Sequence, residues 1–105
     1  MPDTYSVVLA TCPNKEEARK LARLLVEENL VACAQLTDIE SIYVWNDEVC
    51  EEPEVLLILK ARQDAFCQIQ SAILEKHPYG VPQIVQLPII GGLPAYLSWI
   101  DERYL

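Results

Sequence analysis

The spacing of hydrophobic positions switches repeatedly between strand-like alternation and the three-to-four spacing of a helix. Stretches rich in β-branched and aromatic residues predict strands over residues 5–12, 31–45, 49–61 and 83–90. Apolar stripes predict helices over residues 14 to about 29, 64 to about 77, and from 94 toward the C-terminus. The resulting order, β-α-β-β-α-β plus a terminal helix, predicts an α+β, ferredoxin-like sandwich. In that plan an antiparallel sheet carries two helices on one face.

Residues with special capping or backbone roles mark the ends of these elements. Asn14 and Asp64 are the candidate N-caps of the first and second helices. Asn46 and Asp47 tolerate left-handed backbone geometry, so the two long strands are expected to join in a tight turn. Pro53 cannot donate a hydrogen bond to a sheet, so it predicts an edge position or a bulge in the returning strand.

The third predicted strand is too hydrophobic for a sheet that meets water on one face. Residues 55–59 read VLLIL, without the polar alternation that such a strand should have. Both long helices are expected on the same face, so something else must bury the other. The terminal helix is too short to do this alone. The pattern therefore predicts a subunit that associates with copies of itself.

The predicted hairpin of the second and third strands supports the same expectation. About fifteen residues at about 3.3 Å each extend to roughly 50 Å. A compact domain of this length has a radius of gyration of only about 13 Å, so the hairpin must bend or project. Ile42 and Val44 lie on one side of its tip, and Tyr43 and Trp45 lie on the other. Exposed apolar tips of this kind usually mark interfaces.

Composition narrows the class of partner and the compartment. With 105 residues, 51% of them hydrophobic, the chain (1–105) is predicted to be a single globular domain. The net charge of -8 argues against nucleic acid and anionic membranes as partners. We expect no signal peptide and no membrane span. The four cysteines are widely spaced without a CxxC pair, which fits free thiols in the cytoplasm.

His77 is the only histidine available for metal or acid–base chemistry. It lies at the predicted end of the second helix, directly before Pro78, where an imidazole can satisfy last-turn carbonyls. This position favours a structural role over a ligand role. A site for copper or another divalent ion would need further ligands, with a neighbouring subunit as one source. The candidates are Cys12, Cys33, Glu52 and Glu54. No cofactor is expected to be required for folding.

The remaining polar and aromatic residues do not predict an enzyme. No credible serine accompanies His77, and no glycine-rich phosphate loop is present. Glu52 and Glu54 share one strand face, where carboxylates are more often solvated or ion-paired than catalytic. A further set of residues is expected to pack at an interface or, alternatively, to line a small-ligand cleft between subunits. This set is Tyr43, Trp45, Lys60, Tyr79, Tyr96 and Trp99.

Several motifs resemble those of the CutA family of divalent-ion tolerance proteins. They are ACAQ at 32–35, SIYVW at 41–45, EPEV at 52–55, HPYGVPQI at 77–84 and YLSW at 96–99. Their order and spacing extend the resemblance over nearly the whole chain. It implies a ferredoxin-like subunit in a tight cytoplasmic homotrimer, linked to tolerance of copper and other heavy metals. The family fold also resembles the trimeric PII signalling proteins. The alternative is therefore a PII-like sensor or adaptor that binds a metabolite or a partner protein between subunits.

Three positions depart from the pattern of the CutA family. Relatives usually have glycine where this chain has Asp47. Some have a cysteine in place of Ala10 and a second histidine in place of Lys76, and both have been associated with copper binding. The resemblance therefore implies weak or indirect copper binding here. Cys12 is expected on the same strand face as Ala10, where it could partly substitute.

Overall fold

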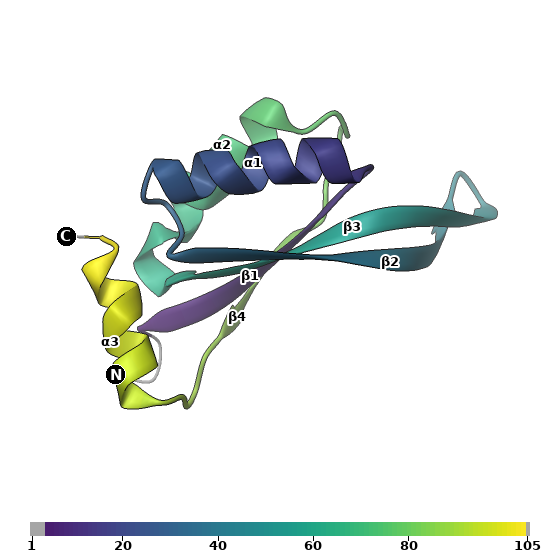
Figure 1. The fold of residues 1–105 in the computed structure, drawn as a ribbon. Helices are drawn as coiled ribbons and strands as arrows, with labels where there is room; N and C mark the ends of the chain where they lie inside the picture. The colour runs from purple at the N-terminus through teal and green to yellow at the C-terminus, as the bar shows by residue number, and fades with distance from the viewer. Residues whose placement is uncertain (1–3, 105) are drawn as a thin grey trace.

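The computed structural model describes residues 4–104, which form a four-stranded antiparallel sheet with helices packed on it. The sheet order is β2-β3-β1-β4, and every neighbouring pair is antiparallel. Figure 1 shows α1 and α2 on one face of the sheet and α3 at its end. The predicted ferredoxin-like plan is confirmed. The elements are β1 (Tyr5–Cys12), α1 (Lys15–Glu27), β2 (Cys33–Trp45), β3 (Glu48–Arg62), a 3-10 turn (Gln63–Ala65), α2 (Phe66–Lys76), β4 (Ile84–Pro88) and α3 (Pro94–Glu102).

The two predicted helix caps had different outcomes. The Asn14 side chain accepts a hydrogen bond from the Glu17 N–H at 2.9 Å, so the cap of α1 is confirmed. The prediction for Asp64 was wrong, because Ala65 occupies the N-cap position of α2 and makes no side-chain cap. The carboxylate of Asp64 instead accepts two hydrogen bonds from the Arg62 guanidinium, each at 3.2 Å. Because its carboxylate is paired with Arg62, Asp64 does not cap α2.

The long hairpin has an unbroken register from its base to its tip. Asn46 and Asp47 have φ angles of 53° and 63°, which is the left-handed geometry of a two-residue turn. Pairing runs without a bulge from Cys33–Lys60 to Trp45–Glu48. β1 pairs with β3 only as far as Val55, so Pro53 lies in the part of β3 that has a free edge. The hairpin projects from the domain, as predicted, and the described chain measures 44 × 25 × 22 Å (Figure 1).

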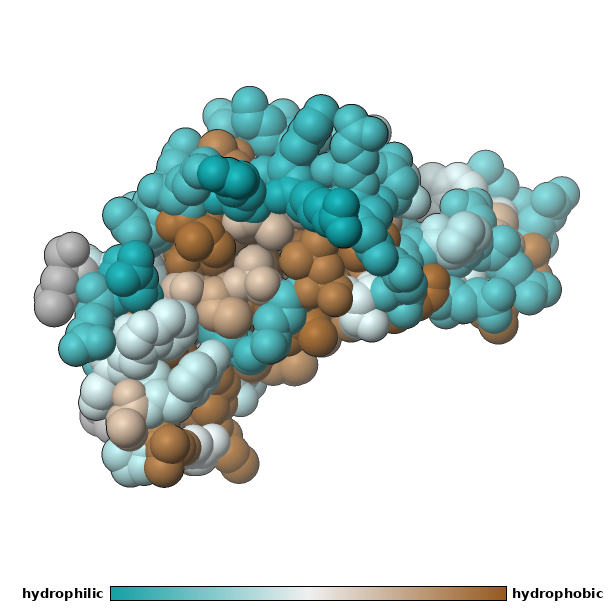
Figure 2. Space-filling view, viewed as in Figure 1, coloured by the Kyte–Doolittle hydropathy of each residue, from teal (hydrophilic) through white to brown (hydrophobic). Residues whose placement is uncertain are grey.

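The hydrophobic core lies between the sheet and the two helices. Alternate residues of β1 and β3 point toward the helices and are buried, which gives the expected period of two. Figure 2 shows that the apolar layer reaches the surface between α1 and the free edge of β2. The largest fully buried side chains are Val8, Cys12, Leu25, Val31, Leu57, Leu59, Ile69, Ile73 and Ile100, with Ser6 among them.

The opposite side of the sheet, here called the open face, is also apolar. Its residues alternate with the core positions and are only partly buried, and Val85 and Leu87 are 43% and 48% exposed. The open face therefore leaves the apolar surface that the VLLIL stretch predicted. Its aliphatic residues are Val7, Leu9, Ile39, Leu56, Ile58, Val85 and Leu87.

The C-terminal helix is attached by a polar network that sequence patterns did not predict. Asp101 accepts hydrogen bonds from the Tyr5 hydroxyl at 2.5 Å and from the Arg62 guanidinium at 2.6 Å. The Tyr104 hydroxyl accepts from the Arg62 backbone N–H at 3.1 Å and donates to the Leu30 carbonyl at 2.7 Å. These bonds join β1, β3 and the loop after α1 to the end of α3.

Candidate functional site

His77 holds the loop that joins α2 to β4. It leaves helical geometry, with φ −87° and ψ 135°, while its N–H still donates to the Ile73 carbonyl at 2.9 Å. Nε2 lies 2.5 Å from the Thr11 carbonyl, and Nδ1 accepts a hydrogen bond from the Tyr79 N–H at 3.2 Å. Because a carbonyl only accepts, the proton must sit on Nε2. His77 therefore fastens the loop to the end of β1.

The described part of the subunit does not fit a metal centre. Both ring nitrogens of His77 are engaged with backbone groups, which leaves no free lone pair for a metal. Cys12 is buried on the helix side of the sheet, whereas Cys33 and Glu54 lie on the open face. Within residues 4–104, no three histidine, cysteine or acidic residues are grouped to hold an ion. The predicted ligands are thus not brought together within one chain.

Four of the predicted residues do meet, on the projecting part of the hairpin beyond the end of β1. The Tyr79 hydroxyl donates to Glu54 Oε2 at 3.2 Å. Burial, followed by the charge of Glu54, raises the pKa of Tyr79 to about 12. The pKa of Tyr43 is also raised, chiefly by hydrogen bonding to Glu52 and then by burial. We call these four residues the tyrosine–glutamate cluster. It keeps both phenols protonated next to carboxylates that can accept from them.

Four further predicted residues gather at the end of the open face that is away from the hairpin tip. Lys60 Nζ donates to the Gln35 side-chain oxygen at 2.6 Å, and Lys60 pairs across the strands with Cys33. Burial and Cys33 raise the pKa of the Tyr96 hydroxyl. The Tyr96 and Trp99 rings stack with centroids 5.6 Å apart. We call Cys33, Lys60, Tyr96 and Trp99 the lysine–aromatic group.

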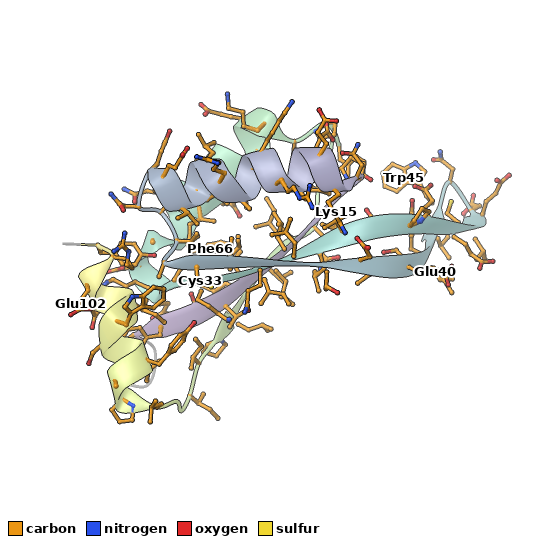
Figure 3. All side chains as sticks on the ribbon, viewed as in Figure 1. Lys15, Cys33, Glu40, Trp45, Phe66 and Glu102 are labelled. Atoms are coloured by element: carbon orange, nitrogen blue, oxygen red, sulfur yellow. The ribbon has the colours of Figure 1, made fainter. Side chains whose placement is uncertain are left out.

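The two groups are too far apart to line one pocket in a single chain. Glu52 and Lys60 are eight residues apart on β3, which corresponds to about 26 Å. Figure 3 shows the length of the hairpin, with Cys33 at one end of β2 and Trp45 at the tip. Trp45, at the tip, is 58% exposed. A shared cleft would need a second subunit to bring the groups together.

Sequence reasoning could find only part of this arrangement. Once the turn at Asn46–Asp47 is assumed, the register places Tyr43 and Glu52 on one face of the hairpin. Tyr79 comes from a loop, where no periodicity fixes the direction of a side chain. The contact between His77 and Thr11 spans 66 residues and has no local signal. Loop geometry therefore had to come from the folded chain.

Comparison with known proteins identifies the family. The sequence model described as "CutA1 divalent ion tolerance protein" matches residues 6–103. The divalent-cation tolerance protein CutA of Thermus thermophilus is 45% identical over 98 residues, which cover 92% of this chain and 95% of that protein.

Solved structures agree over almost the whole fold. CutA1 from Shewanella sp. SIB1 superposes with a TM-score of 0.94 at 35% identity, covering 98% of this chain and 97% of that one. The periplasmic divalent cation tolerance protein CutA from Archaeoglobus fulgidus gives a TM-score of 0.94 at 32% identity, covering 96% and 99%. The chain therefore belongs to the CutA1 family of divalent ion tolerance proteins.

Proposed function

We propose that this chain is a cytoplasmic, homotrimeric and non-enzymatic protein of divalent-cation tolerance, which responds to heavy metals such as copper. Membership of the CutA1 family supports the general role. The apolar open face is the observation that carries the assembly, because a lone subunit would leave Val85 and Leu87 against water. The number three comes from the resemblance to the family.

In this proposal, copper is bound weakly or its effect is indirect. Copper prefers converging nitrogen and sulfur ligands. His77 is engaged at both nitrogens, and burial raises the pKa of the Cys12 thiol to about 11, which disfavours the thiolate. A chain with a net charge of -8 still attracts cations at long range, which allows weak metal binding.

A second candidate is a PII-like sensor or adaptor that binds a metabolite or a partner protein between subunits. It is favoured by the separation of the tyrosine–glutamate cluster from the lysine–aromatic group. If neighbouring subunits pack through their open faces and hairpins, one subunit can present carboxylates and phenols near the cation and rings of the next. Such a cleft would offer both charges and aromatic surface to a small molecule.

Two measurements on the purified chain and one on cells test the first proposal. Light scattering at low concentration should give three times the mass of one chain. Copper titration should give no tight stoichiometric site, and deletion of the gene should make cells more sensitive to copper. A monodisperse monomer, or unchanged growth in copper, would overturn the proposal. Metabolite-induced thermal stabilisation without any metal effect would favour the sensor.

The cytoplasmic location is part of the proposal and rests on the free cysteines. All four cysteines are unpaired in the structure. In residues 4–104, no helix is long and apolar enough to cross a membrane. Because the Archaeoglobus relative carries the word periplasmic in its name, fractionation of cells that express the tagged full chain is the direct test. Recovery with periplasmic markers would overturn the location.

A further inference from the structure

A pocket opens in the helix layer, on the side away from the open face. Its volume is about 270 Å³, and it lies where α1 begins and α2 ends, above the last residue of β1. The tyrosine–glutamate cluster lies on the hairpin and in the loop after α2, and the lysine–aromatic group lies on the open face and on α3. Of the predicted metal ligands, only Cys12 and His77 reach this pocket.

The floor and walls of the pocket are apolar. Cys12 is 2% exposed and Leu21 is 5% exposed, and Leu24 and Pro78 complete the walls. Burial raises the pKa of the Cys12 thiol to about 11, so the sulfur is uncharged at neutral pH. His77 presents ring carbons, because its two nitrogens bond to Thr11 and Tyr79. A metal ion would find neither a thiolate nor a free imidazole here.

The mouth of the pocket carries more positive than negative charge. Lys20, Lys76 and Glu17 lie around it. Lys20 has a loose surface pair with Glu16 at 3.4 Å, in which both side chains are more than three-quarters exposed. The ammonium group of Lys76 makes no ion pair with any residue between 4 and 104. Because Lys20 is paired with Glu16, the positive charge that remains available at the mouth is that of Lys76.

We propose that this pocket binds a small organic anion, namely a monocarboxylate with an apolar body. The carboxylate would accept hydrogen bonds from Lys76 and Lys20 at the mouth. The body would pack on Leu21, Leu24 and Pro78 above Cys12. The volume lies just below the usual range for ligand pockets, which suits a small molecule of roughly ten non-hydrogen atoms.

Benzoate is a suitable probe, because it combines one carboxylate with a flat apolar ring. In an amide-resolved NMR titration of the full chain, benzoate should shift the Cys12, Leu21 and Leu24 resonances to saturation. Lys76→Gln should weaken binding about tenfold, the loss expected for one charged hydrogen bond. Arg19→Gln removes the same charge from the exposed surface of α1, outside the pocket, and should leave the affinity unchanged. Benzylamine, with the same ring and the opposite charge, should bind far more weakly.

Cys12 provides a second readout that does not depend on the lysines. Saturating benzoate should slow the alkylation of Cys12 by iodoacetamide, followed by peptide mass mapping. The exposed Cys67 is the internal control and should react at an unchanged rate. The proposal is overturned if the benzoate shifts do not saturate, or if benzylamine produces the same shifts as benzoate. Equal losses from Lys76→Gln and Arg19→Gln would also overturn it.

Discussion

At the scale of single residues, the most informative side chain is His77. It satisfies the carbonyl of Thr11, a residue only 4% exposed, and orients the Tyr79 backbone at the same time. The cost of leaving a buried carbonyl unpaired explains why a histidine is useful here without any metal. Its neighbour Tyr79 then reaches Glu54 and completes the tyrosine–glutamate cluster.

Replacement of His77 by alanine should therefore affect stability more than chemistry. His77→Ala removes both ring hydrogen bonds and should lower the free energy of unfolding by about 1–3 kcal/mol. Urea unfolding at a fixed protein concentration measures this loss. Glu75→Ala, at an exposed site two residues away, is the control and should stay near the native value. Equal stability of the two variants would contradict the structural role of His77.

The raised pKa of Tyr79 predicts a specific loss of stability at alkaline pH. An unfolded tyrosine releases its proton near pH 10.0, but the folded one holds it to about pH 12. Between these values the unfolded state binds fewer protons, so stability falls as the pH rises. Tyr79→Phe should make this fall shallower in unfolding experiments across the same window.

Glu54→Gln provides an independent check on the cause of this pKa. Burial is the largest cause, and the Glu54 charge is the next. Removing that charge should lower the pKa of Tyr79 without returning it to 10.0, as followed by tyrosinate absorbance. An unchanged titration curve would mean that the Tyr79–Glu54 contact does not form in solution.

At the scale of elements, the projecting hairpin depends on its two-residue turn. Both turn residues have positive φ, and Trp45 pairs directly with Glu48, so the turn sets the register of every pair down to Cys33–Lys60. This register places Glu52, Glu54 and Tyr43 on one face. It also leaves Pro53 on the free edge of β3, where its missing donor protects against unwanted strand pairing.

Substitutions at Asp47 should separate backbone strain from side-chain chemistry. At φ 63°, glycine is unstrained, so Asp47→Gly should stabilise the chain by several tenths of a kcal/mol. Asp47→Val places a β-branched residue in the left-handed region and should destabilise it by about 1–2 kcal/mol. Thermal unfolding of the pair measures the difference. If both variants melt alike, the turn in solution does not have this geometry.

At the scale of the whole molecule, burial is strongly asymmetric between the two sheet faces. The helix side is covered by α1 and α2, whereas the open face keeps aliphatic residues on all four strands in partial contact with water. α3 is attached at the end of the sheet through Arg62 and Asp101 and does not extend over the rest of the face (Figure 1). Self-association through the open face would bury these residues, as the proposed trimer requires.

Two leucines with nearly equal exposure test which surface is the interface. Leu87 on the open face is 48% exposed, and Leu74 on the outer side of α2 is 50% exposed. Leu87→Lys would place a charge in the proposed interface and should shift the mass in light scattering toward the monomer. Leu74→Lys makes the same chemical change on the helix layer and should leave the mass as it is. The opposite pattern would locate the interface on the helices.

The sequence alone determined the elements, their order and the apolar character of both sheet faces. Strands and helices follow from periodicity, which is local, and the positive-φ turn follows from Asn46 and Asp47. It also limited the candidate chemistry to a single histidine and a few carboxylates and aromatics.

Only the tertiary structure decided which of those residues act together. The His77–Thr11, Tyr79–Glu54 and Tyr5–Asp101 contacts join residues 25 to 96 positions apart. Asp64 does not cap α2 for a local reason, because its carboxylate accepts hydrogen bonds from the Arg62 side chain two residues earlier. Such contacts depend on where loops cross the ends of the sheet and on which rotamers fit there. Sequence periodicity encodes neither the loop crossings nor the rotamers. The site therefore had to be located in the folded chain.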